Sequence, residues 1–141
     1  MNYGRLVAAA AAATVSDAVY GFLVYGTLMA SEFGKYPNVY RPADVGQAFL
    51  PLMFAGIFIA MIAATAIYAK GYEGGSGASE GARFGALVGV FMVGAFAGVS
   101  YAILNINKKI TLMLATAAFV EWILAGVVIG LVYKPGASSS R

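Results

Sequence analysis

The stretch that decides the fold is residues 48–69, AFLPLMFAGIFIAMIAATAIYA, which carries no charged side chain. A transmembrane helix needs about 20 consecutive, predominantly apolar residues. Pro51 lies close enough to the start of the stretch to fit into the opening turns of a helix. Asp44 and Gln47 just before it have the spacing of a capping box. The stretch is therefore predicted to be a membrane-spanning helix.

Three further apolar stretches, residues 6–30, 84–104 and 110–133, have similar length. The sequence thus predicts an all-α fold: a bundle of four transmembrane helices in a single integral membrane domain over residues 1–141, with a short tail at 135–141. The connection at 105–109 is so short that the third and fourth helices must be antiparallel neighbours. Residues 70–83 are rich in glycine and serine, which indicates a flexible joint between two antiparallel hairpins.

The first apolar stretch has an alternative interpretation as a secretory signal, with residues 1–5 as its basic start and the alanine run as its apolar region. Against this, the apolar stretch continues well past Asp17 as far as Met29. A first span is the favoured prediction.

The composition excludes several classes of function. The chain is 61% hydrophobic and 11% charged, against about 25% charged residues in typical soluble domains. It contains no cysteine and no histidine, so disulfides, iron–sulfur clusters and the usual haem ligand are excluded, and we expect no metal site and no cofactor. The net charge of +3 comes from residues at segment ends, which favours lipid headgroups over nucleic acid as the partner. Contact with a pigment or quinone through Trp122 or the tyrosines stays open.

Basic residues at the two ends of the predicted bundle are nearly balanced, which biases insertion only weakly. One end holds Arg5, Lys70, Arg83, Lys134 and Arg141, and the other holds Lys35, Arg41, Lys108 and Lys109. Four spans place both termini on the same side, and we expect the cytoplasmic side of a bacterial inner membrane. Dual topology, with copies inserted both ways, is the alternative.

Asp17 and Glu121 lie near the middles of the first and fourth spans. A charge at the bilayer centre costs on the order of 3 kcal/mol, so such residues face the protein interior and are functional-site candidates. Each acid lies about eleven residues from the start of its span, at similar depth, so the two could approach one another. If they meet, two like charges in a low dielectric are unfavourable, and the pair is expected to hold a proton.

No lysine or arginine lies at matching depth, so the expected partners of these acids are neutral. Candidate hydrogen-bond partners are Tyr20, Ser100 and Tyr101, with Tyr25, Thr65 and Thr116 as further candidates. One interpretation is a proton or cation site. The other, which we favour at this point, is that neutral acids hold helices together through hydrogen bonds worth about 0.6 to 2 kcal/mol each.

Glycines recur at a spacing that lets helices approach closely in lipid. They are Gly81, Gly85, Gly89, Gly94, Gly98, Gly126 and Gly130. Packing within the chain is the favoured interpretation, and a homodimer or partner-subunit interface is the alternative. No enzymatic activity and no catalytic residue are expected, because without His or Cys the sequence offers no nucleophile paired with a base.

The plan of the chain resembles an uncharacterised bacterial family of small four-helix integral membrane proteins. The similarity rests on the short start at residues 1–7, on EGARFG at residues 80–85, and on a closing helix with Glu121, Trp122 and Gly126. That family implies no established activity. Small multidrug transporters are similar in outline, with a buried acid in the first of four helices, but the residues around Asp17 do not reproduce their acid-centred motif.

The first functional prediction is a structural or accessory protein that packs against other membrane proteins or itself. The alternative is a proton-coupled small-molecule transporter that uses Asp17 and Glu121 as buried proton sites. The loop at residues 31–47 is predicted to be a headgroup-level connector, with a docking surface as the alternative.

Overall fold

The computed structural model describes residues 2–133, and it is helical throughout, with no strand in that range. Four continuous helical segments, Tyr3–Leu28, Asp44–Lys70, Gly77–Ile103 and Lys108–Val132, are long and apolar enough to cross a membrane. The prediction of an all-α bundle with four transmembrane helices is confirmed. The tail predicted at 135–141 lies outside the described residues.

Several of these segments are built from more than one element. The elements are α1 (Tyr3–Leu23), η1 (Val24–Leu28), α2 (Ala30–Phe33), α3 (Ala43–Gly46), η2 (Gln47–Phe49), α4 (Leu50–Lys70), α5 (Gly77–Met92), η3 (Val93–Gly98), α6 (Val99–Ile103) and α7 (Lys108–Val132). The π-helical turn η1 ends the first helical segment, and the π-helical turn η3 lies inside the third. Such turns are rare and often mark functional sites.

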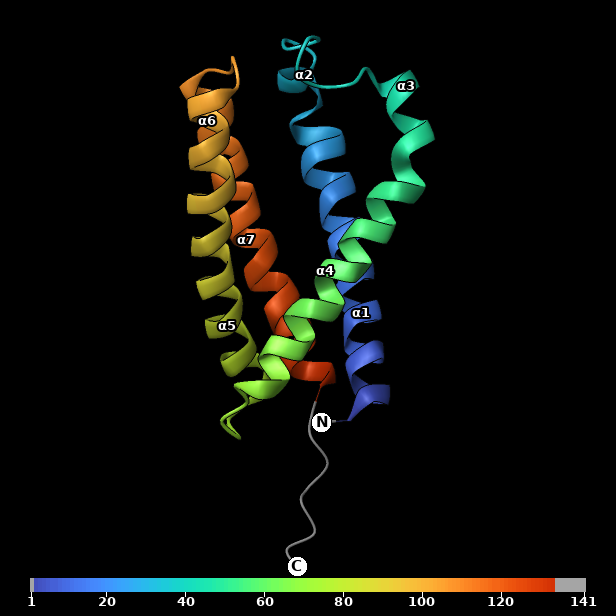
Figure 1. Cartoon of the computed structure of the whole chain (residues 1–141), viewed down its shortest axis with the longest axis vertical. Helices are drawn as coiled ribbons and strands as arrows, with labels where there is room; N and C mark the ends of the chain where they lie inside the picture. Colours follow the sequence, from blue (N-terminus) through green and yellow to red (C-terminus); the bar gives the residue numbers. More distant parts are fainter. Residues whose placement is uncertain (1, 134–141) are drawn as a thin grey trace, which may run out of the picture.

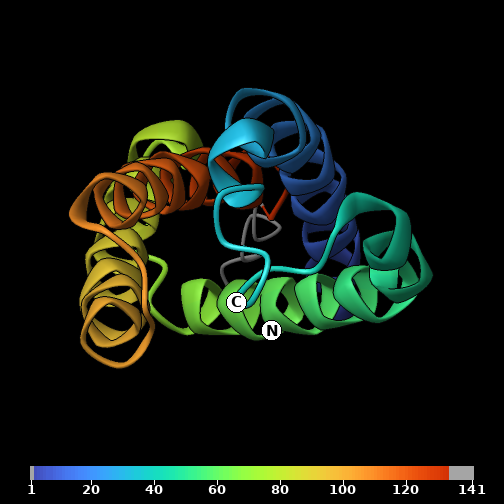
Figure 2. The same cartoon turned by 90° about the horizontal axis from the view of Figure 1, so that it is seen from above.

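The helices form two hairpins that meet through α1 and α7. Helix α5 packs along α7, and α1 packs against both α7 and α4. Helix α4 crosses α1 and then diverges from α5 toward the end of the molecule that holds α2 and α3 (Figure 1). Seen from above, the four long helices follow a curved row in the order α4, α1, α7, α5 (Figure 2). The first loop crosses over the space that this row partly encloses.

The α5–α7 contact is made by glycines from both helices. A Cβ atom placed on Gly81 would collide with the carbonyl group of Gly126, and one on Gly130 would collide with the carbonyl group of Gly77. Gly85 and Gly89 meet α7 in the same way, at Trp122 and Phe119. Because only hydrogen fits at these positions, the two backbones touch, as close helix packing in lipid requires.

Gly94 and Gly98 take no part in this interface, contrary to the prediction that they pack helices within the chain. A Cβ on Gly94 would meet nothing within 4 Å, and one on Gly98 would meet only the carbonyl oxygen of Val93 at 3.7 Å. The π-helical turn η3 contains both residues. Gly94 follows Gly89 by five residues, which places it about 140° further around the helix, so the glycine stripe of α5 leaves the α7 contact at this point.

The glycine-rich joint was predicted at residues 70–83, but the joint in the structure is shorter, because α5 already begins at Gly77. The missed signal was Gly77 itself, which continues the four-residue spacing of Gly81 and Gly85 and packs on α7. Glu80 ties the remaining loop to the helix. Its carboxylate accepts hydrogen bonds from the backbone amides of Glu73 at 2.5 Å and Gly75 at 2.9 Å.

At the opposite end, an ion cluster ties the first loop to the start of α7. The Glu32 carboxylate accepts from the ammonium groups of Lys109 at 2.6 Å and Lys35 at 2.8 Å. These two hydrogen bonds, that of Lys109 first, lower the pKa of Glu32. Nearby, the Asn107 side chain caps α7 by accepting from the amide of Ile110. The loop at 31–47 is thus fastened to the bundle.

The buried core is divided into two clusters. One lies toward the start of α1 and the end of α7 and is built around Ala9, Ala13 and Ile129. The other lies under the first loop and is built around Met29 and Ile110. The middle of α1 and the middle of α7, which carry Asp17 and Glu121, lie between these clusters.

Candidate functional site

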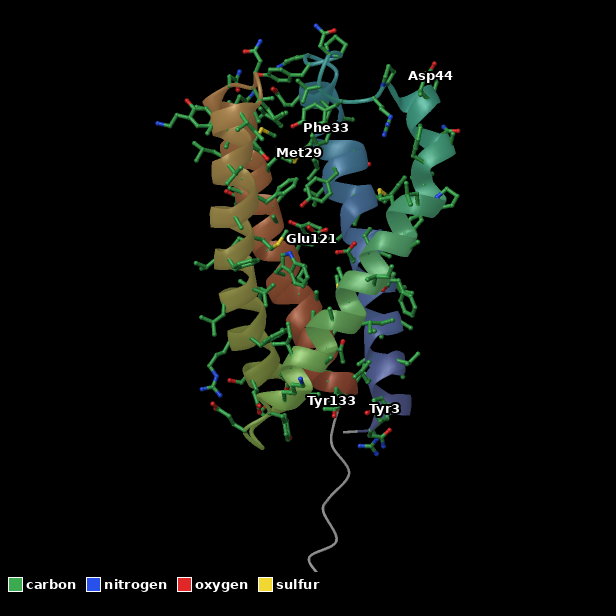
Figure 3. All side chains as sticks on the ribbon, in the orientation of Figure 1. Tyr3, Met29, Phe33, Asp44, Glu121 and Tyr133 are labelled. Atoms are coloured by element: carbon green, nitrogen blue, oxygen red, sulfur yellow. The ribbon has the colours of Figure 1, made fainter. Side chains whose placement is uncertain are left out.

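The side chains of Asp17 on α1 and Glu121 on α7 lie beside one another and line the same cavity. Figure 3 shows Glu121 near mid-height of the bundle, while Tyr3 and Tyr133 both lie toward one end. The packing of α1 against α7 brings the two acids together. A hydrogen bond between two carboxyl groups requires one proton between them, since two carboxylates offer only acceptors. The contact therefore depends on whether that proton is present.

Tyr25 holds the Glu121 side chain in place. The Tyr25 hydroxyl donates to Glu121 Oε2 at 2.8 Å. Tyr25 belongs to the π-helical turn η1, in which the amide of Met29 bonds to the carbonyl of Val24 at 2.8 Å. The hydroxyl that reaches the acid pair thus belongs to a residue of this turn.

The other predicted polar partners, Tyr20, Ser100 and Tyr101, form no hydrogen bond with the acids in the described part of the chain. Tyr20 donates to the carbonyl oxygen of Ala117 at 2.8 Å and meets the Tyr25 ring edge-on at 6.2 Å between centroids. Ser100 lines a cavity that also contains Glu121 but makes no hydrogen bond with either acid in the described part of the chain. Tyr101 is 51% exposed and lines neither of the cavities that Glu121 borders. The prediction that Tyr101 is a partner of the acids was therefore wrong.

The acid pair lines an apolar cavity of about 670 Å³ between α1, α4 and α7. Aromatic and methionine side chains form much of its wall. They are Phe22, Tyr25, Met53, Phe54, Met61, Met92 and Trp122. Phe22 is 72% exposed and Leu50 is 41% exposed, so part of the wall belongs to the outer surface. The cavity therefore opens sideways, between the diverging helices α1 and α4.

A second cavity of about 260 Å³ lies on the α5 side of α7. It shares Tyr25, Met92, Glu121 and Trp122 with the larger one. Trp122 therefore borders both cavities beside Glu121. The structure places this side chain at a cavity wall. These four shared side chains form the partition between the two spaces.

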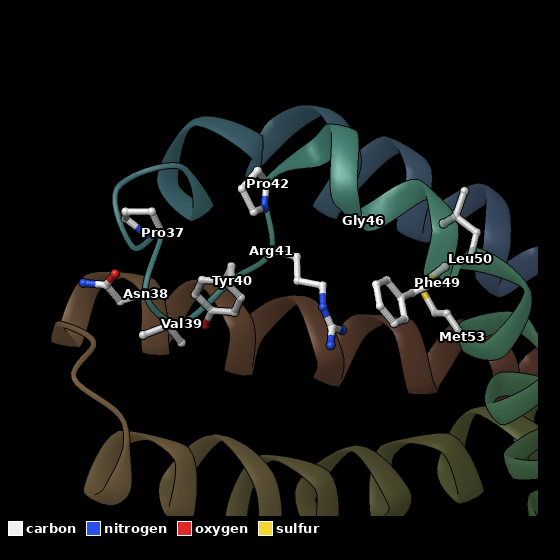
Figure 4. A pocket seen from close by; sticks show the side chains of 10 residues that line it. All are labelled: Pro37, Asn38, Val39, Tyr40, Arg41, Pro42, Gly46, Phe49, Leu50 and Met53. Carbon is white, nitrogen blue, oxygen red and sulfur yellow. The ribbon is translucent and has the colours of Figure 1, made fainter.

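A third hollow of about 700 Å³ lies at the end of the molecule, under the first loop (Figure 4). Pro37 and Tyr40 line it from the loop, and Phe49 and Met53 line it from the start of the α4 segment. Arg41 reaches across it, with its guanidinium carbon 3.8 Å from the centre of the Phe49 ring. The sequence indicated a headgroup-level loop here but not this arrangement of arginine and ring.

The described residues contain no group of three or more side chains of the kinds that hold a metal ion. The chemistry that the arrangement offers is instead proton exchange on a carboxyl pair beside a space for a lipophilic molecule.

No family model, no curated protein and no solved structure matches this chain. The resemblance to an uncharacterised four-helix family stays a prediction.

Proposed function

We propose that this protein is a proton-linked carrier of the membrane, which binds a lipophilic molecule in the cavity beside Asp17 and Glu121. The observation that carries the proposal is that the two acids line an apolar cavity of about 670 Å³ that opens sideways. Acids that served only to hold helices together would be enclosed by packed side chains. Small-molecule sites are typically apolar pockets with a few polar groups that converge on one point.

The mechanism follows from the proton that the pair shares. With one proton present, Asp17 and Glu121 hydrogen-bond and hold α1 against α7. Loss of that proton leaves two carboxylates that repel one another in a low dielectric. Because both acids and Tyr25 border the cavity, this repulsion would change its shape and its affinity for a ligand. Proton release and ligand movement would thereby be linked.

Proteoliposomes that contain a trapped pH-sensitive dye test the proposal. After a pH gradient is imposed, with and without the lipophilic probe N-phenyl-1-naphthylamine, we expect proton flux above that of empty liposomes. Asp17→Asn and Glu121→Gln should assemble normally, because amides can still hydrogen-bond, but should lose this flux. The control is Tyr101→Phe, which changes an exposed tyrosine of α6 in the third span. Wild-type flux no higher than in empty liposomes, or intact flux in both acid variants, would contradict the proposal.

An accessory or structural role is the second candidate, and Gly94 and Gly98 favour it. Both are exposed and lie four residues apart, a spacing that allows a second helix to approach closely. Native mass spectrometry of the protein extracted gently from its membrane tests this role. A stoichiometric partner or a dimer that Gly94→Leu disrupts would support it. A monomer in every extract would oppose it.

For the location we propose a bacterial inner membrane, with the end that holds Arg5, Lys70 and Arg83 in the cytoplasm. Since the chain has no cysteine, a single introduced cysteine can be labelled without background. Ser76→Cys should be protected from an impermeant reagent in intact cells, and Asn38→Cys should react. The reverse pattern would contradict this orientation, and labelling of both would indicate dual topology.

A further inference from the structure

The hollow under the first loop is bordered by a cation with no carboxylate partner. Arg41 lies over the Phe49 ring at 3.8 Å, and none of the ion pairs among residues 2–133 includes it. A guanidinium that stacks on an aromatic ring keeps its N–H groups available for other contacts. Its planar fork suits the oxygens of a phosphate group. The mouth of the hollow therefore offers an anion site.

The hollow and the membrane cavity share part of their walls. Leu50 and Met53 line both spaces, so one apolar surface runs from the Arg41 region along the first turns of α4. The deeper cavity then extends to Trp122 and the acid pair near mid-height. The arrangement is amphipathic, with one cation at the membrane end and hydrocarbon-lined space below it.

The occupant that matches this arrangement has an anionic head and a long apolar chain. We propose that an anionic phospholipid of the surrounding bilayer binds here, with its phosphate at Arg41 and one acyl chain along Leu50 and Met53 in the cavity beside Asp17 and Glu121. The sideways opening between α1 and α4 lets the lipid enter from the bilayer. The inference rests on the proposed function, because it names the class of molecule that occupies the same cavity.

Trp122 gives a direct readout, because it is the one tryptophan in the chain and lies at the cavity wall. The protein is reconstituted into phosphatidylcholine bilayers that contain small fractions of lipid brominated in mid-chain, a quencher of tryptophan. Brominated phosphatidylglycerol is compared with brominated phosphatidylcholine at equal fractions. We expect phosphatidylglycerol to be favoured about fivefold at the quenching site, the ratio expected from one arginine near an anionic lipid surface.

Arg41→Gln should reduce this preference to about equal binding, and Arg41→Lys should retain most of it. Lys108→Gln, which removes an exposed cation of the same membrane end away from the hollow, should leave the preference unchanged. Higher salt should weaken the preference in the wild type. The comparison of the two lipids in the wild type tests the inference even if a variant fails to fold.

Equal quenching by the two lipids in the wild type would overturn the inference, and so would a preference that survives Arg41→Gln. Quenching by a brominated fatty acid that is strong and independent of Arg41 would replace the phospholipid by another occupant, and overturn it too. Lipid preference without proton flux in the proteoliposome assay would support this inference while the proposed carrier fails. Proton flux without lipid preference would do the reverse.

Discussion

Tyr25 is the residue on which the geometry of the acid pair depends. Its hydroxyl donates to Glu121 Oε2 at 2.8 Å, and Glu121 meets Asp17. The acids themselves were identifiable from the sequence, because a charged side chain among apolar neighbours is costly. The sequence did not distinguish Tyr25 from Tyr20 as the partner of Glu121, because both tyrosines follow Asp17 on the first span.

Tyr25→Phe removes this hydrogen bond and leaves the ring. We expect a loss of about 1 kcal/mol in the free energy of unfolding, the typical net value of such a bond. Infrared spectra should show the carboxyl C=O stretch of Glu121 at higher frequency, as for a carboxyl with one hydrogen bond fewer. Tyr101→Phe is the control and should change neither quantity. Identical spectra for wild type and Tyr25→Phe would show that the bond does not form in the membrane.

The ion cluster of Glu32, Lys35 and Lys109 makes stability depend on pH. Because its pKa is lowered in the folded protein, Glu32 stabilises the fold above its ordinary pKa, and this contribution is lost as pH falls through the lowered value. Glu32→Gln should therefore lower the melting temperature at neutral pH and make no difference in strong acid. Thermal unfolding of both proteins from neutral pH to about pH 3 measures this. Asp44→Asn, at a carboxylate with no ion pair in the described range, is the control. A constant difference between wild type and Glu32→Gln at every pH would contradict the assignment.

At the scale of the elements, the glycine spacing correctly indicated a close helix pair. The interval of five residues between Gly89 and Gly94 breaks this spacing and turns Gly94 and Gly98 out of the contact, which the prediction overlooked. The prediction also missed Gly77 at the start of α5, which lies within the stretch predicted to be a flexible joint. In lipid, small residues mark helix contacts as often as flexible segments, so glycine content alone does not separate the two.

Substitution of these glycines tests the α5–α7 contact. Gly81→Ala should destabilise the protein by about 1 to 3 kcal/mol, because the added methyl group collides with the backbone of α7 at Gly126. Gly94→Ala adds the same group where nothing lies within 4 Å, and should be neutral or slightly stabilising through its better helix propensity. Denaturant titration in detergent micelles compares them. Equal effects of the two substitutions would mean that α5 and α7 do not pack as described.

At the scale of the whole molecule, hydropathy predicted the four spans because a bilayer imposes both length and apolarity on each helix. It did not predict the divergence of α4 from α1, because hydropathy distinguishes residues that face lipid from residues that face protein only on average. The sideways cavity depends on that divergence. Residues on its α4 wall, such as Ala60, have no distinguishing pattern in the sequence.

Filling the cavity tests whether it is a binding site. Ala60→Phe places a ring in the large cavity and should reduce binding of N-phenyl-1-naphthylamine at least severalfold, measured by energy transfer from Trp122. Ala63→Phe adds the same ring at an exposed position of α4 outside the cavity and should leave binding unchanged. Equal binding by the two variants would mean that the probe binds elsewhere.

The central claim is that Asp17 and Glu121 share one proton inside the membrane, and infrared spectroscopy of the protein in lipid nanodiscs tests it most directly. We predict a protonated-carboxyl band at neutral pH that shifts or disappears in Asp17→Asn and also in Glu121→Gln, because each acid is the hydrogen-bond partner of the other. A spectrum without a protonated carboxyl, or a band that only one of the two substitutions affects, would contradict a shared proton.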